Sequence, residues 1–171
     1  VIVFMVLGGL FPETSIGWYR KHFNISSADS GTHFQIQFDG IFRNANIWLN
    51  GFFVGNNMSG YIGASYDVTD FIRFDRDNVL VVRVDATQYE GWFYEGAGIY
   101  RHVWLNQYDN LHIPAGGLFV YADVQNKTAT INIETAVENQ NFSSVNCTVY
   151  SYITDRDGKQ LVQTKEQPLL L

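Results

Sequence analysis

Apolar and polar residues alternate along most of the chain, and stretches with the 3.6-residue period of a helix are nearly absent. The segment HFQIQFDG (33–40) is the clearest case, because Phe34, Ile36 and Phe38 are separated by glutamines. A period of two is typical of a strand with one buried face, since successive side chains point to opposite faces of a sheet. Similar alternation predicts strands over residues 78–86, 99–105, 118–124, 128–139, 146–155 and 159–164.

Two dipeptides predict hairpin turns between these strands. Asn50-Gly51 lies between two apolar runs in NANIWLNGFFVGN (44–56), and Asn-Gly is the strongest short-range signal for a two-residue hairpin. Asp157-Gly158 predicts a second hairpin near the end of the chain. The regular succession of short strands and turns predicts an all-β fold of the sandwich or jelly-roll type.

The alternating pattern is interrupted at Pro114, whose nitrogen cannot donate a hydrogen bond to a neighbouring strand, and at the flexible pair Gly116-Gly117. We therefore predict one domain over residues 1–113 and a second over residues 117–171. Four strands are predicted in the second domain, whereas an immunoglobulin-like sandwich needs about seven strands in about 100 residues. The expectation is a jelly-roll β-sandwich followed by an incomplete immunoglobulin-like β-sandwich.

An incomplete sandwich leaves strand edges and apolar side chains uncovered. Unpaired edges are templates for another chain, so the sequence predicts a homo-oligomer built through residues 117–171 by strand pairing or exchange. The apolar side chains expected to lack a facing sheet are Leu118, Val120, Ile131, Ile133, Val149 and Ile153.

Composition limits the fold class and the kinds of partner that the chain can have. The aromatic share is 16%, which favours strands, and the net charge of −6 argues against a nucleic-acid partner because such partners require a basic patch. The apolar start VIVFMVLGGLF (1–11) is too short to span a bilayer, and we interpret it as a strand or a processed end. Cys147, the single cysteine, is expected to be a small buried hydrophobe. The compartment stays unknown, with a periplasmic or secreted location favoured over a cytoplasmic one.

One segment fits neither a plain strand nor a plain loop. EGWFYEGAGIYRHVWL (90–105) combines five aromatic residues, three glycines and two glutamates. Glycine weakens a buried strand, and a solvent loop that exposes adjacent aromatic residues loses the stabilisation of burying them. The mixture indicates a specialised segment, such as a binding site.

Five segments together resemble the N-terminal sugar-binding domain of glycoside hydrolase family 2, the family of β-galactosidases, β-glucuronidases and β-mannosidases. In chain order they are GWYRKHF (17–23), FDGIFRNANIWLNG (38–51), SGYIGASYDVTDFI (59–72), NVLVVRVD (78–85) and WFYEGAGIYRHVWL (92–105). The resemblance covers about residues 8–113, and the following segment looks like the start of the family's immunoglobulin-like domain.

The resemblance implies that catalysis occurs elsewhere. In this family two glutamates on a (β/α)₈ barrel perform the chemistry, and such a barrel takes about 250 residues. Nothing in this sequence matches the two catalytic motifs, so we expect a non-catalytic N-terminal fragment that docks a missing catalytic barrel and is inactive alone. No cofactor and no metal are expected.

The resemblance also implies that the loop before the GIYR strand forms one wall of the sugar site. Aromatic rings stack on the apolar faces of pyranose rings, and carboxylates accept hydrogen bonds from hydroxyls. The expected partner is a carbohydrate, β-galactoside-like or related. Trp92 stands where better-known relatives place an aspartate, which leaves the sugar open. The predicted substrate-binding residues are Glu90, Trp92, Phe93, Tyr94 and Glu95.

Other readings stay open. The chain is alternatively a free-standing carbohydrate-binding jelly roll, or a structural module that only docks a barrel. Arg43, Asn44 and Asn46 either line a polar groove or form edge hydrogen bonds. Arg101 is expected in a partly buried ion pair, with Asp39 or Asp85 as its partner. The four histidines lack metal-ligand spacing.

Overall fold

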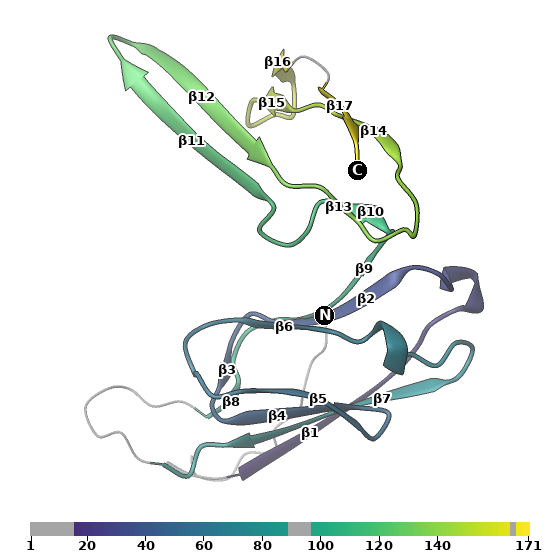
Figure 1. Ribbon diagram of the computed structural model, residues 1–171. Coiled ribbons are helices and arrows are strands. Elements are labelled where there is room, and N and C mark those ends of the chain that lie inside the picture. The colour runs from purple at the N-terminus through teal and green to yellow at the C-terminus, as the bar shows by residue number, and fades with distance from the viewer. Residues whose placement is uncertain (1–15, 89–96, 165–166) are drawn as a thin grey trace. The chain divides into compact units, whose positions relative to one another are not determined.

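The structure is a computed structural model that describes residues 16–88, 97–164 and 167–171. Its contacts divide the chain into two units, Val1–Tyr108 and Asp109–Leu171 (Figure 1). Both units consist of antiparallel strands, and the described residues hold only two short 3₁₀ helices, η1 (Ser27–Asp29) and η2 (Thr69–Phe71). The all-β fold predicted from the alternating pattern is confirmed.

The first unit is a sandwich of two sheets (Figure 1). The larger sheet has the order β1-β7-β4-β5, built from β1 (Ile16–Asn24), β7 (Asp77–Asp85), β4 (Ala45–Leu49) and β5 (Phe52–Asn57). The smaller sheet has the order β6-β2-β9, built from β6 (Ala64–Asp67), β2 (His33–Phe38) and β9 (Val103–Tyr108). A short pair joins β3 (Ile41–Phe42) to β8 (Gly98–Ile99).

The core lies between these two sheets, where the period of two predicted it. Every second residue of the three central strands is buried, because these side chains meet across the sandwich. Burying one such aliphatic or aromatic side chain stabilises the fold by about 1.5–3 kcal/mol. The buried set is Phe34, Ile36, Phe38, Ile41, Ala45, Ile47, Leu49, Val68, Leu80, Val82, Val84 and Val103.

The predicted hairpin at Asn50-Gly51 is confirmed. Asn50 has φ 55° and Gly51 has φ 88°, the left-handed conformation that a two-residue hairpin requires at both positions. The Asn50 amide also accepts a hydrogen bond from the Val79 N–H at 2.9 Å and donates to the Phe71 carbonyl at 2.7 Å. The turn is therefore fixed to both β7 and η2.

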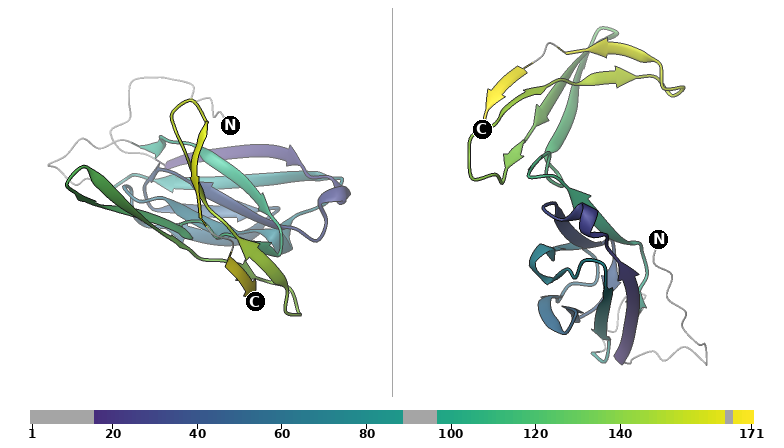
Figure 2. Two further views of the ribbon diagram at one scale, coloured as in Figure 1. Left: turned by 90° about the horizontal axis from the view of Figure 1, so that it is seen from above. Right: turned by 90° about the vertical axis from the view of Figure 1, so that its right-hand side faces the viewer.

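The second unit consists of paired strands. The longest pair is the ribbon of β11 (Leu118–Gln125) and β12 (Thr128–Thr135), which Figure 2 shows from two sides. The predicted hairpin at Asp157-Gly158 is confirmed between β15 (Tyr152–Thr154) and β16 (Gln160–Gln163). The remaining pairs are β10 (Leu111–His112) with β13 (Glu138–Asn139), and β14 (Asn146–Val149) with β17 (Gln167–Leu170).

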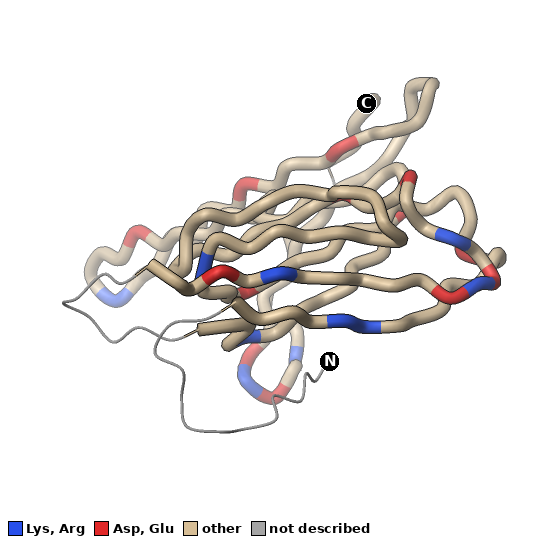
Figure 3. Tube along the Cα trace, turned by 90° about the horizontal axis from the view of Figure 1, so that it is seen from below, with Lys and Arg blue, Asp and Glu red and all other residues tan. Residues whose placement is uncertain are grey.

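The charged residues of the described chain lie mostly near strand ends and turns, with both signs interspersed (Figure 3). Within residues 16–88, 97–164 and 167–171, no helix is both long and apolar enough to cross a membrane. The same residues contain no group of three or more histidine, cysteine or acidic side chains that could hold a metal ion.

Candidate functional site

The candidate site lies at the end of the first unit where β3 and β8 pair, because residues 88 and 97 bracket the aromatic segment predicted to bind sugar. The predicted substrate-binding residues Glu90, Trp92, Phe93, Tyr94 and Glu95 lie outside the described residues. The site is therefore built from the side chains on either side of that segment.

Gly98 holds the chain close to the sandwich just after this segment. It pairs with Phe42 on β3 and has φ 106°, a conformation that residues with a side chain rarely adopt. A Cβ atom at this position would also overlap the Tyr19 hydroxyl. Gly98 therefore meets both a conformational and a steric requirement for glycine, whereas Gly96 lies outside the described residues.

Tyr100, just after β8, connects this end of the first unit to the main chain at Gly40 and Gly60. Its N–H donates to the Gly40 carbonyl at 3.3 Å, and its hydroxyl donates to the Gly60 carbonyl at 2.8 Å. A Cβ at Gly40 would overlap the Tyr100 ring, and a Cβ at Gly60 would overlap the Phe42 ring. Phe42 is buried and meets the exposed Tyr61 edge to face at 5.6 Å. Because Gly40 and Gly60 have no side chain, the rings of Tyr100 and Phe42 can pack against the main chain beside Gly98.

Arg43 joins the two sides of the site. Its Nη2 donates to the Gln88 Oε1 at 2.8 Å, and its guanidinium carbon lies 5.7 Å from the centroid of the Phe42 ring. A guanidinium over an aromatic face is stabilised by the quadrupole of the ring. The Arg43 carbonyl accepts from the Asp85 N–H at 3.1 Å, which ties the same loop to the end of β7. Arg43 therefore anchors the last described residue before the predicted sugar-binding segment.

Asp85 is held ionised beside this anchor. Its carboxylate accepts from the Thr87 hydroxyl at 2.6 Å and from Arg83 Nη2 at 2.8 Å. The Thr87 hydroxyl and then the Arg83 side chain hold the pKa of Asp85 below its ordinary value of 3.8. An ionised carboxylate accepts hydrogen bonds, which suits a sugar hydroxyl, and it has no proton to give a leaving group.

The lowered pKa of Asp85 predicts a specific loss of stability in acid. A carboxyl whose folded pKa is depressed stabilises the fold above its unfolded pKa, near 3.8, and this contribution disappears as the pH falls through the folded pKa. We expect Asp85→Asn to flatten the decrease in the free energy of unfolding between about pH 5 and pH 2. Urea unfolding at several pH values measures it, with the exposed Asp70→Asn as control. Parallel curves for Asp85→Asn and the unmodified chain would contradict the assignment.

Asp39 occupies a different environment from the one predicted. Its carboxylate accepts from Trp104 Nε1 at 2.8 Å and from Gln37 Nε2 at 3.0 Å. Trp104 is the main cause that lowers the pKa of Asp39, and the charge of Arg101 adds to it. Arg101 itself is exposed, and Asp85 pairs with Arg83. The predicted partial burial of Arg101 is therefore wrong, whereas the charge of Arg101 does act on Asp39, one of its two predicted partners.

The predicted strand over residues 99–105 is interrupted. β8 ends at Ile99 and β9 begins at Val103, and the intervening residues follow Gly40 and Asp39 through main-chain hydrogen bonds. Of the other polar candidates, Arg43 bonds to Gln88, Asn44 adopts φ 44°, and Asn46 lies on the solvent side of β4. Gln88 and Thr87 were missed by sequence reasoning, because their roles depend on Arg43 and Asp85 meeting them in space.

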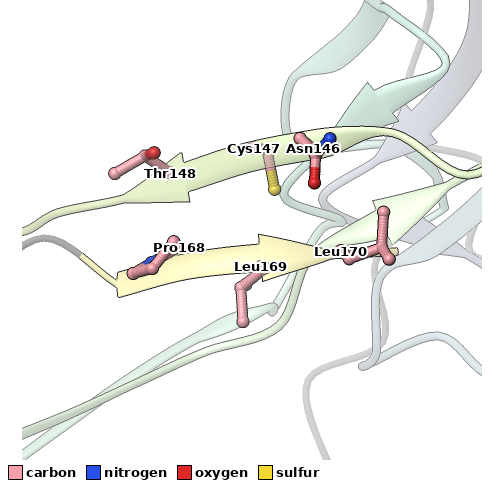
Figure 4. Close-up of a pocket in the computed structure, with 6 residues that line it drawn as sticks. All are labelled: Asn146, Cys147, Thr148, Pro168, Leu169 and Leu170. Atoms are coloured by element: carbon pink, nitrogen blue, oxygen red, sulfur yellow. The ribbon is translucent and has the colours of Figure 1, made fainter.

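A pocket of about 440 Å³ in the second unit is lined by residues of the paired strands β14 and β17 (Figure 4). Its side chains are uncharged, and they include Cys147, which was predicted to be a small buried hydrophobe and is partly buried. The lining offers no acid, base or cationic group, so the site at β3 and β8 remains the candidate. The pocket is lined by Asn146, Cys147, Thr148, Pro168, Leu169 and Leu170.

The chain is similar to known proteins of one family. The family described as "Glycosyl hydrolases family 2, sugar binding domain" matches residues 10–109. "Beta-galactosidase BoGH2A" of Bacteroides ovatus is 39% identical over 160 residues, which cover 92% of this chain and 19% of that protein. A beta-glucuronidase of Formosa agariphila is 31% identical over 163 residues, which cover 82% of this chain and 17% of that protein.

Solved structures agree in fold. A glycosyl hydrolase family 2 member from Bacteroides cellulosilyticus superposes with a TM-score of 0.87 at 34% identity, covering 91% of this chain and 22% of that one. A beta-glucuronidase from glycoside hydrolase family 2 superposes with a TM-score of 0.86 at 28% identity, covering 92% of this chain and 19% of that one. The chain thus spans about a fifth of the length of the relatives it matches.

Proposed function

This chain belongs to glycoside hydrolase family 2, and from that premise we propose that it is the sugar-binding part of a glycosidase that hydrolyses terminal β-glycosidic bonds. The match of residues 10–109 to the sugar-binding domain carries this proposal. A β-galactoside-like substrate is favoured over a β-glucuronide because the relative named as a β-galactosidase is 39% identical and the one named as a β-glucuronidase 31%. The chemistry belongs to a catalytic barrel of the same polypeptide, and this chain supplies one wall of its sugar site.

The wall consists of the predicted segment and the side chains that anchor it. We propose that Trp92, Phe93 and Tyr94 stack on sugar rings and that Glu90 and Glu95 accept hydrogen bonds from hydroxyls. The anchors are the described residues: Gly98 fixes the chain after the segment, and Arg43 holds Gln88 before it. Arg43 acts as a positioning residue, and the ionised Asp85 beside it supplies a further acceptor.

The electrostatics of three described aspartates oppose a role of these groups in proton donation. A glycosidase acid requires a raised pKa so that it holds a proton near neutral pH. Asp39, Asp75 and Asp85 all have a pKa held below the ordinary aspartate value, by hydrogen bonds first to Trp104, Ser27 and Thr87 respectively. These three carboxylates therefore act as acceptors.

We expect the chain alone not to hydrolyse glycosides. Retaining hydrolysis needs an acid and a nucleophile about 5–5.5 Å apart, and the proposal places both on the barrel. The assay uses 4-nitrophenyl β-galactoside, β-glucuronide and β-mannoside at high protein concentration, with the Bacteroides ovatus enzyme as positive control. Turnover that copurifies with the chain and disappears when one of its own acidic residues is replaced would refute the proposal.

A chimera tests the role of the anchor. In the Bacteroides ovatus β-galactosidase, the region that aligns with this chain is replaced by the chain itself. We expect the chimera to retain β-galactosidase activity, and Arg43→Ala in it to raise KM about tenfold, a loss of about 1.4 kcal/mol of binding, with a smaller change in kcat. Arg43→Lys keeps the charge but loses the planar fork, so partial rescue is expected.

The matched control is Gln160→Ala, an exposed substitution in the second unit. A folded chimera without activity would contradict the equivalence of the two domains. An Arg43→Ala effect confined to thermal stability, with KM unchanged, would assign Arg43 a purely structural role.

A further inference from the structure

The outer face of the larger sheet carries a cluster of aromatic rings, two exposed and one half-buried, which we call the aromatic platform: Trp18 on β1, the half-buried Trp48 on β4, and Phe53 on β5. The two indole rings stack with centroids 5.9 Å apart and planes 24° apart. Phe53 meets Trp48 edge to face at 5.8 Å. The side chains of Trp18 and Phe53 are 64% and 56% exposed, so the platform presents ring surface directly to solvent.

The strand pattern fixes the direction of these rings. On β1, Tyr19 and Phe23 pack against the core, so Trp18, the residue before Tyr19, points to the opposite face. β7 runs between β1 and β4, with Arg83 directly opposite Trp18 and Val81 directly opposite Trp48. The two indoles therefore meet above β7. A tryptophan left this exposed loses the stabilisation of burial, and a cluster of exposed aromatic rings marks a binding surface.

Polar groups border the platform on the same face. Arg83 is paired with the Asp85 carboxylate at 2.8 Å, and Asn46 lies opposite Arg83 in the register of β4. Arg20 follows Trp18 by two residues on β1 and so shares its face. Flat aromatic faces beside amide, guanidinium and carboxylate groups match the two sides of a pyranose ring, whose C–H face is apolar and whose edge carries hydroxyls.

The size of the platform favours a sugar over a second copy of the chain. Aromatic side chains bury about 150–250 Å² each when fully covered, so three partly exposed rings offer about 300 Å². A stable protein partner needs about 800 Å² on each side. One or two sugar rings need far less.

We propose that the aromatic platform is a non-catalytic glycan-binding surface that stacks pyranose rings of a β-linked chain on Trp18 and Phe53. Its three aromatic rings are not residues of the sugar-site wall at β3 and β8, although the Arg83–Asp85 pair borders both, and its binding does not require the catalytic barrel. A shallow surface covers one side of the ligand only, so the expected dissociation constant is in the millimolar range, and its use is to keep a polymeric substrate near the enzyme.

The test titrates the chain of residues 1–171 with β-1,4-galactohexaose and cellohexaose, following tryptophan fluorescence, and repeats the measurement by affinity electrophoresis in soluble β-1,4-galactan. We expect binding to at least one of these glycans. Trp18→Ala should weaken it at least tenfold and Trp18→Phe less, while Phe142→Ala, at a fully exposed ring of the second unit, leaves it unchanged. Phe53→Ala is the second platform variant, and circular dichroism verifies the fold of each.

Three results would overturn the proposal. The first is glycan binding that is unaffected by both Trp18→Ala and Phe53→Ala, and the second is no binding to any of the three glycans. The third is a dimer in sedimentation velocity that Trp18→Ala converts to a monomer, which would assign the platform to a second copy. Trp92→Ala separates the two proposals, because it should raise KM in the chimera and leave galactan binding by the isolated chain intact.

Discussion

Replacing Phe38 with alanine is expected to lower the free energy of unfolding of the first unit by about 3–5 kcal/mol. The Phe38 ring is fully buried at the end of β2 and meets Tyr66 edge to face at 6.4 Å. β2 pairs with β6 on one side and β9 on the other. Because β2 is hydrogen-bonded to both β6 and β9, the surrounding strands cannot move inward to fill the cavity that the missing ring would leave. The free energy of the cavity therefore adds to the loss from removing a buried apolar side chain.

The effect is measured by urea unfolding followed by tryptophan fluorescence, since all the described tryptophans lie in the first unit. Ile36→Val on the same strand is the matched control, with an expected loss of about 0.5–1.5 kcal/mol. A loss below about 1 kcal/mol for Phe38→Ala would mean that the sheets close over the vacancy and that this end of the core is loosely packed.

The core of the first unit could be predicted because burial and strand period coincide there. Phe34, Ile36 and Phe38 are buried, and the glutamines between them are not, as the alternation requires. The hairpin at Asn50-Gly51 was equally predictable, since few residues tolerate a positive φ. At Asp157-Gly158 only Gly158 has a positive φ, and the Asp155 carboxylate accepts from two main-chain N–H groups to complete a longer turn.

Long-range pairing limits what the pattern predicts. β14 pairs with β17, so residues 167–170 of the tail QPLLL form a strand that the alternating pattern did not predict. The predicted strand over residues 146–155 is two strands, β14 and β15, which pair with different partners. An alternating pattern predicts which face of a strand is buried, but it does not predict which other strand pairs with it. The division of residues 146–155 into two strands could therefore be seen only in the structure.

The candidate site was only partly predictable for the same reason. Glycine at residue 98 is consistent with a backbone conformation that other residues rarely adopt, and its φ of 106° is such a conformation. The bond between Arg43 and Gln88 joins side chains 45 residues apart, and no local signal marks Gln88. The aromatic platform is another such case, because Trp18 and Trp48 come together only across β7.

Asn78 is the second position where a single change is expected to have a large effect. It is fully buried, and its amide makes four hydrogen bonds that close the turn before β7. Its Oδ1 accepts from the Arg73 N–H and the Asn50 Nδ2, both at 2.8 Å. Its Nδ2 donates to the Arg73 carbonyl at 2.8 Å and the Arg76 carbonyl at 3.2 Å.

Asn78→Ala should lower the free energy of unfolding by about 3 kcal/mol, because it removes these four bonds and leaves the part-buried main-chain groups of Arg73 and Arg76 and the Asn50 amide without these partners. Asn56→Ala, at an exposed asparagine of β5, should change it by less than about 0.5 kcal/mol. Asn50 shares the network, so the double variant with Asn50→Gly, which tolerates φ 55°, should cost less than the sum of the single losses. Urea unfolding of the unmodified chain, the two single variants Asn78→Ala and Asn50→Gly, and the double variant supplies the cycle. Additive losses would show that the hairpin and the turn before β7 are stabilised independently, against the coupling that the shared hydrogen bond implies.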